Sequence, residues 1–269
     1  AVSGAFLFFY TQVKGKNPLV RLDVLKDTNY LFGTVMLILI NAVLLASLAI
    51  LPQMLQYLLG YDSFLSGLAI MPRGLGCLTA LLIFGGLGGR LSYRTYGIVG
   101  LICLGIGGWM LGLLNLEINP MNIAIPNYVF GLGLVFSFMP ITTLSCITIR
   151  NDQMTNASGL QNLLKTIGGA IGTSLVATMI SRFSQVHQMM MVGHLNFSSD
   201  AYTAKINSLA ASFAANTDLA TATHMAGMQL YNQLLQQASL WGYVETFRYF
   251  GLAAFVIIPL VLIIRQRAK

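Results

Sequence analysis

The sequence predicts an all-α transmembrane protein, because charged residues are few and apolar residues form long runs. Of the 269 residues, 56% are hydrophobic and 9% are charged, whereas soluble domains carry about 25% charged residues. A helix needs about 20 mostly apolar residues to cross a bilayer. Strands of a membrane barrel would instead alternate in segments of about ten residues. The continuous runs therefore favour spanning helices.

Six apolar runs of sufficient length follow one another along the chain. They extend from about Tyr30 to Tyr57, Ser63 to Gly89, Tyr96 to Leu114, Ile123 to Ile149, Ala157 to Ile180 and Tyr243 to Ile264. Residues 1–10 resemble the end of a preceding transmembrane helix, and residues 11–29 a linker. We therefore expect a fragment whose residues 30–269 form one six-helix domain.

Lysine and arginine predict the orientation of these helices. One side of the predicted bundle has only Arg182 and Lys205 in its loops, and the other side collects Lys14, Lys16, Arg21, Lys26, Arg90, Arg94, Arg150, Arg265, Arg267 and Lys269. Positively charged loops stay in the cytoplasm. The first span is thus predicted to run outward and the carboxy terminus to lie inside. This pattern accounts for the net charge of +7 without nucleic acid as a partner.

The one long connection, residues 184–242, is predicted to lie outside and to be inserted before the last helix. Its first part has apolar residues at helical spacing: Tyr202, Ile206, Leu209 and Phe213. Ser198, Ser199 or Asp200 is a suitable cap for that helix. From Met225 onward a second helix is expected to run into the last span. The segment is therefore predicted to be a helical hairpin.

Three stretches carry a resemblance to a known family: LLGYDSFLSGLAIMPR at residues 58–73, GLGGRLSYRTYG at 86–97 and ASGLQNLLKTIGGAIG at 157–172. They resemble the patterns LGYS…AGL…LPR, GxLxDRxGxR and ASGLxNxxRxxGGxxG of the fourteen-helix drug:proton antiporters (EmrB/QacA type) of the major facilitator superfamily. His187 also matches a histidine common there. Tyr93 stands where that family usually has Asp. Lys165 stands for Arg, which keeps the charge and loses the bidentate fork.

The resemblance implies an architecture, an activity and partners. The chain would be the six-helix carboxy-terminal domain of a major facilitator fold, with a partial helix before it and a helical periplasmic loop before the last helix. Its implied function is efflux of lipophilic drug-like molecules across the bacterial inner membrane, by proton antiport and alternating access. The implied partners are the missing amino-terminal half, a periplasmic adaptor (membrane fusion) protein, an outer-membrane channel and membrane lipid.

A substrate cavity is expected near the bilayer midplane. Its candidate residues are the polar, charged or aromatic side chains within spans: Asn41, Gln53, Gln56, Tyr57, Arg73, Tyr128, Phe136 and Phe138. Each can instead pack against another helix. Arg73 follows Ser63 by ten residues, which puts it roughly 15 Å deep. We expect it to line the cavity and pair with a carboxylate of the missing half; the alternative is a side chain that reaches back to the surface.

Two further groups of residues follow from the motifs. The cytoplasmic loop motif comprises Gly89, Arg90, Arg94 and Gly97. Its two arginines are predicted to bond helix carbonyl ends or an acid of the other domain, unless they only set topology. The conformational helix motif comprises Asn162, Lys165, Gly168, Gly169 and Gly172. Its glycines would let two helices approach closely.

Acidic residues in the spans are scarce. Glu245 alone enters a span, and its predicted partner is Arg248, one helical turn away. The proton-carrying acids are therefore expected in the missing half. No enzyme motif, cofactor site or metal-ligand spacing is present. Two other functions stay open at this point: a carrier for a metabolite or siderophore, and a scaffold that only holds an adaptor protein.

Overall fold

The computed structural model describes residues 22–87, 92–116, 120–194, 200–214 and 218–264. The regular elements of these ranges are all helical: η1 (Leu22–Lys26), α2 (Thr28–Tyr57), α3 (Ser63–Leu87), α4 (Tyr93–Leu111), α5 (Pro120–Cys146), η2 (Asn151–Gln153), α6 (Met154–His194), α7 (Asp200–Phe213) and α8 (Leu219–Ile263). Six of these helices are long and apolar enough to cross a membrane. The predicted all-α fold is confirmed. The partial helix expected over residues 1–10 lies outside the described residues.

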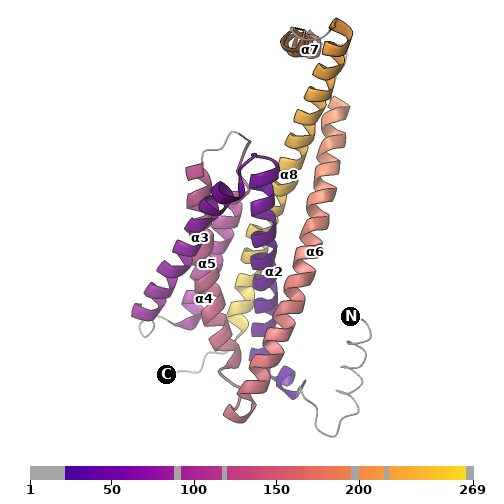
Figure 1. The fold of residues 1–269 in the computed structure, drawn as a ribbon. Helices are drawn as coiled ribbons and strands as arrows, with labels where there is room; N and C mark the ends of the chain where they lie inside the picture. The colour runs from indigo at the N-terminus through magenta and orange to yellow at the C-terminus, as the bar shows by residue number, and fades with distance from the viewer. Residues whose placement is uncertain (1–21, 88–91, 117–119, 195–199, 215–217, 265–269) are drawn as a thin grey trace.

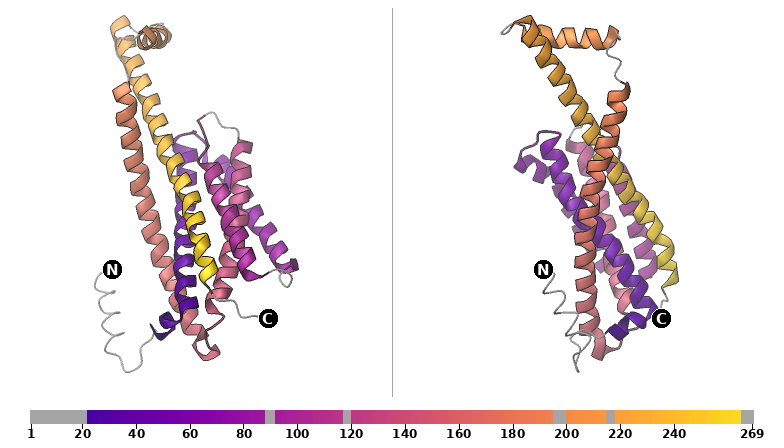
Figure 2. Two further views of the ribbon diagram at one scale, coloured as in Figure 1. Left: turned by 180° about the vertical axis from the view of Figure 1, so that it is seen from behind. Right: turned by 90° about the vertical axis from the view of Figure 1, so that its right-hand side faces the viewer.

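The six long helices form one bundle from which a hairpin projects (Figure 1). Helix α5 packs against α3 and α4, α2 packs against α5 and α6, and α8 packs against α4 and α6. The far ends of α6 and α8 extend beyond the other helices, and α7 lies across their tip (Figure 2). We call this end of the bundle the hairpin side. The opposite end, where α2 begins and α8 ends, is the terminal side.

Short polar residues fix several helix ends. The side chain of Asp27 accepts a hydrogen bond from the Tyr30 amide at 2.9 Å and caps α2. Ser92 caps α4 in the same way. Asp218 caps α8, and hydrogen bonding to Thr221 lowers the pKa of its carboxyl below the ordinary value. Between α2 and α3 the chain turns at Gly60, whose φ of 68° suits glycine because it has no Cβ.

The hairpin is more continuous than the sequence predicted. Helix α6 continues to His194, beyond the predicted end at Ile180, because residues 181–192 contain no proline or glycine that would interrupt it. Helix α8 likewise starts at Leu219 and runs unbroken into the span. The predicted helix at the tip is confirmed as α7. Its apolar face packs on α8 in a small cluster of Ile206, Ala210, Ala222 and Ala226.

Glycines bring several pairs of helices close together, among them α3 with α5 and α2 with α6. A Cβ added to Gly131 on α5 would overlap the carbonyl oxygen of Arg73 on α3. On α6, a Cβ at Gly168 would overlap Ile38 of α2, and one at Gly172 would overlap the Cβ of Ala42. Without side chains, the helices gain van der Waals contact that lipid does not otherwise drive. The α3–α5 and α2–α6 contacts therefore depend on these positions.

Replacing Gly172 with alanine should separate α6 from α2. Relief of the overlap with Ala42 requires a backbone shift, and overpacking of this kind costs about 1–3 kcal/mol. The matched control is Gly159→Ala on the same helix, where a Cβ meets nothing within 4 Å. That variant should gain up to about 1 kcal/mol, because alanine is the better helix former. Unfolding in mixed micelles measures both, and equal stability of the two variants would contradict the packing argument.

Candidate functional site

Arg73 lies buried between three helices, with 4% of its surface exposed. Its Nε donates to Oδ1 of Asn127 on α5 at 3.1 Å. One terminal nitrogen donates to the hydroxyl of Ser47 on α2, also at 3.1 Å. The guanidinium stands 4.8 Å from the centre of the Phe130 ring, a cation–π distance. Arg73 thus joins α2, α3 and α5 in the interior of the bundle.

The partners of Arg73 are neutral groups. No carboxylate pairs with it among the described residues, and its second terminal nitrogen has no hydrogen-bond partner there. A charge held away from water is costly unless it is paired. Two hydrogen bonds and a ring face compensate part of that cost. The sequence predicted Arg73 within the span but not its partners Ser47 and Asn127. Their only distinguishing feature in the sequence is a polar side chain inside an apolar run.

A second cation, Lys165, belongs to α6. Its ammonium lies 4.8 Å from the centre of the Phe138 ring on α5. Asn41 on α2 donates to the backbone carbonyl of Lys165 at 2.8 Å. Lys165 and Phe138 are both half-buried. The structure therefore brings three predicted residues from α2, α5 and α6 together at one place.

Other predicted cavity residues lie elsewhere. Gln53, Gln56 and Tyr57 are exposed at the hairpin-side end of α2. The Tyr128 hydroxyl donates to Thr79 on α3 at 3.1 Å. Phe136 is buried against Tyr96 and Ala80, which is the helix-packing role left open for it. The eight candidates are thus distributed over several helix contacts.

The two motif groups have different surroundings. Arg94 donates to the carbonyl of Ile264, the residue that ends α8; this is a helix-end contact of the predicted kind. Gly97 packs on Ile141 and Val261, while Gly89 and Arg90 lie outside the described residues. In the second motif, Gly168 and Gly172 contact α2 as described above, and Gly169 lies against Asn41 and Leu45. Asn162 is exposed.

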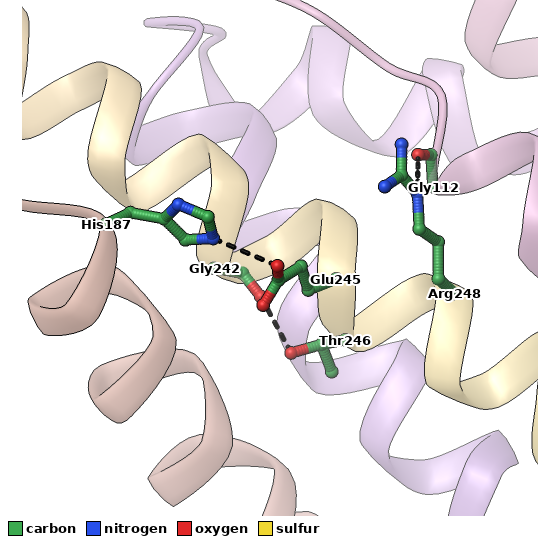
Figure 3. Close-up of polar contacts among 6 residues, drawn as sticks. All are labelled: Gly112, His187, Gly242, Glu245, Thr246 and Arg248. Carbon is green, nitrogen blue, oxygen red and sulfur yellow. Dashed lines mark hydrogen bonds and ion pairs between the residues drawn. The ribbon is translucent and has the colours of Figure 1, made fainter. Parts of the chain in front are cut away.

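The predicted pair of Glu245 with Arg248 is replaced by two other contacts (Figure 3). Glu245 lies 3.0 Å from Nε2 of His187 on α6. Arg248 donates instead to the backbone carbonyl of Gly112 at the end of α4, at 2.9 Å. A carbonyl at a helix end is an acceptor without a partner in its own helix. The spacing of these residues along the sequence predicts neither contact, because each joins residues of different helices.

One hollow of about 370 Å³ lies on the open face of α6, lined by Ala170, Ile171, Ser174, Leu175 and Thr178. It is mostly apolar with two hydroxyl groups. All five residues belong to one helix, so this is a shallow depression and not an enclosed ligand site. Among the described residues no cluster of three or more His, Cys, Asp or Glu side chains is placed to hold a metal ion. The arrangement suits contact with apolar molecules, lipid or another helical domain.

Comparison with known proteins identifies the family. Residues 4–173 match the model of the Major Facilitator Superfamily. The chain belongs to this superfamily. Its six apolar helices accordingly belong to a multi-pass membrane protein, as the sequence predicted.

Relatives within the superfamily include proteins named for multidrug export and one named for fatty acid resistance. The chain is 29% identical to the multidrug export protein EmrB of Haemophilus influenzae over 181 residues, which are 67% of this chain and 36% of that protein. It is 26% identical to the fatty acid resistance protein FarB of Neisseria gonorrhoeae over 257 residues, 94% of this chain and 49% of that protein. The probable multidrug resistance protein EmrY of Escherichia coli is 25% identical over 182 residues.

These matches confirm the predicted resemblance to EmrB-type members of the superfamily. They also bear on length, because the chain spans half or less of the relatives named here. The activity of a whole transporter is therefore a proposal for this chain.

The buried Arg73–Asn127 contact should be measurable as a coupling free energy. Asn127→Leu removes the acceptor of a buried guanidinium and should cost about 1–3 kcal/mol. In an Arg73→Met background, with no guanidinium to satisfy, the same change should cost much less. The double-mutant cycle isolates the difference, read by unfolding in mixed micelles. Asn122→Leu, at an exposed position of the same helix, should have little effect. A cycle that closes additively would show that the contact contributes nothing.

Proposed function

We propose that this chain is the carboxy-terminal half of a multidrug exporter that works by proton antiport and alternating access. The observation that carries the proposal is the superfamily match over residues 4–173, combined with relatives whose names describe multidrug export. The described bundle has six helices that are long and apolar enough to span a membrane, and α6 has an exposed apolar face. A second six-helix domain against that face would complete a transporter of this kind.

The open face supports the need for a second domain or lipid against it. Helix α6 has large apolar side chains exposed at every fourth position: Leu163 (41%), Ile167 (48%), Ile171 (55%) and Leu175 (59%). Helix α3 has a similar exposed stripe. Exposed apolar patches of this size mark contact with protein or membrane. Lys165 leaves α6 on the opposite face from this stripe, because it is two residues from both Leu163 and Ile167, and it contacts α2 and α5 there.

The proposed location is the bacterial inner membrane with the carboxy terminus inside. Basic residues support this orientation, since Lys26, Arg94 and Arg150 belong to the terminal side and positive segments remain cytoplasmic. The hairpin side then faces the periplasm. An adaptor protein and an outer-membrane channel are the partners we propose for it.

We assign the proton-carrying acids to the other half of the proposed transporter. In the described part of the chain, the aspartates stand at helix ends and turns, and Glu245 is the acidic residue that lies within a long helix away from its ends. Intramembrane acids are the usual proton relays of transporters. Arg73, although buried, is the charge of this half most suited to respond to such an acid across the midplane.

A second candidate substrate class is fatty acids. The relative named for fatty acid resistance matches 94% of this chain. Lys165 offers a half-buried cation beside the aromatic ring of Phe138. A carboxylate head group would pair with that ammonium.

Reconstituted full-length protein should release protons from loaded vesicles when a substrate is added. Cationic drugs, uncharged drugs and long-chain fatty acids are each tested by a pH-sensitive dye. For a carboxylate substrate, Lys165→Gln should raise KM about tenfold, which corresponds to one lost charge-assisted contact. Uncharged drugs should keep the parental KM.

Lys165→Arg is the matched control, because it keeps the charge and should keep the fatty acid response. If Lys165→Gln changes all substrates equally, the residue has no selective role. If no compound of any class releases protons, antiport fails and the scaffold function is favoured. Competition by a metabolite or siderophore, with no response to drugs, would favour a different carrier.

The hairpin should bind the adaptor protein. Met189 and Met190 on α6 and Met228 on α8 are exposed on it, at 70%, 57% and 58%, and flexible methionines suit protein contacts. Deleting residues 196–216 should abolish cross-linking to a co-expressed adaptor, while membrane insertion and the six spans are kept. Substituting Met121, exposed on the bundle itself, by Gln is the control and should leave cross-linking intact. Persistent cross-linking after the deletion would rule out docking at the tip.

A further inference from the structure

The contact between His187 and Glu245 joins α6 to α8 at the base of the hairpin. Nε2 of His187 lies 3.0 Å from a carboxylate oxygen of Glu245, and their side chains are 20% and 31% exposed. The two helices are in tight contact next to this pair. A Cβ at Gly242 would overlap the Ser184 hydroxyl and lie 2.9 Å from the Ile180 carbonyl. A change in the pair therefore acts where the helices have little room to adjust.

The imidazole of His187 is held from a second direction. Its ring stacks on Trp241 of α8, with ring centres 5.6 Å apart and an angle of 29° between the planes. In Figure 3 the His187 ring points across to Glu245, and Arg248 points the opposite way to Gly112. Because Arg248 donates to that carbonyl, His187 is the hydrogen-bond partner of the Glu245 carboxylate.

The pair lies at the edge of the membrane-spanning part of α8. Glu245 precedes the end of the helix at Ile263 by eighteen residues, or about 27 Å at the α-helical rise. The hydrocarbon core of a bilayer is about 30 Å thick. With Ile263 at the terminal-side boundary, the pair reaches the hairpin-side boundary. Its partial exposure then permits exchange of protons with the water outside.

Few other groups near the pair change charge at moderate pH. Arg182 on α6 and Arg248 on α8 stay protonated. Tyr57, Tyr243 and Tyr249 carry phenol groups, which bind no further proton in moderate acid. Imidazole is the side chain that commonly gains a proton at moderate pH. The imidazole of His187 is therefore the proton acceptor that this pair offers.

We propose that His187 and Glu245 form a proton-binding site on the hairpin side, whose occupancy controls how firmly α6 and α8 are held together. The bound proton adds to Nδ1 of His187, since Nε2 already donates to Glu245. Protonation places a positive charge on the imidazole opposite the negative carboxylate, so that the hydrogen bond becomes an ion pair. Acidification outside thus stabilises the joined state of the two helices, and neutral or alkaline conditions weaken it. This site is separate from substrate binding and from the coupling acids assigned to the other half.

Proton binding can be read from Trp241, because a protonated imidazole in contact with an indole quenches its fluorescence. The full-length protein is placed in lipid nanodiscs and titrated between about pH 5 and 8. The emission of Trp241 is obtained as the difference from a Trp241→Phe variant. It should fall on acidification, and the fall should disappear in His187→Gln. His224→Gln, the same change at an exposed histidine of α8, should behave like the parent.

Helix separation is read independently from spin labels at Gln185 on α6 and Gln236 on α8, both exposed. Acidification should enrich the joined population by up to about fivefold, the gain that a partly exposed ion pair gives when both of its groups are charged. Glu245→Gln should retain the fluorescence response and lose the distance response, because the histidine still binds a proton but meets no carboxylate. A pH-dependent distance that survives in Glu245→Gln, or a Trp241 signal that survives in His187→Gln, would overturn the proposal. Neither measurement depends on drug transport.

Discussion

The guanidinium of Arg73 constrains three helices at once, because a charge held away from water must find its partners within the protein. Its hydrogen bonds fix the level of Ser47 on α2 and Asn127 on α5. The same level is fixed a second time by Gly131, which lets the α5 backbone rest on the Arg73 carbonyl. A slide of α3 along α5 would break the polar contacts and the glycine contact together. These three helices therefore behave as one rigid body.

Helix α6 is attached by a different kind of contact. Its partners in the bundle are α2 and α8. Three glycines set it against α2, and the contact of Lys165 with α2 runs through its backbone carbonyl. Its outward face carries no partner from the described residues in the membrane region, where the apolar stripe is exposed. Sliding along α2 would also break the hydrogen bonds from Tyr30 to the Ala157 carbonyl and from Asn41 to the Lys165 carbonyl, so neutral contacts rather than a buried charge hold α6 in place.

Sequence patterns predicted the elements far better than the contacts between them. Composition and run length were sufficient for six spans, since each spanning helix must satisfy its own backbone in lipid. Helical spacing was likewise sufficient for α7. Counting residues placed Arg73 well inside a span, but it did not identify the partners of Arg73, because Ser47 and Asn127 are brought to it only by the packing of α2 and α5. The partner predicted for Glu245 was wrong for the same reason. Arg248 is its neighbour along the helix, yet the end of α4 provides Arg248 with a carbonyl that no local spacing reveals.

The continuity of α8 has a mechanical consequence. With 45 residues in one helix, α8 is about 68 Å long, and it runs from the tip of the hairpin to the far side of the bundle (Figure 1). A tilt of about 5° at its base would displace the tip by about 6 Å. A small tilt of α8 inside the membrane would therefore move the hairpin tip much farther than it moves the residues near the base of the helix.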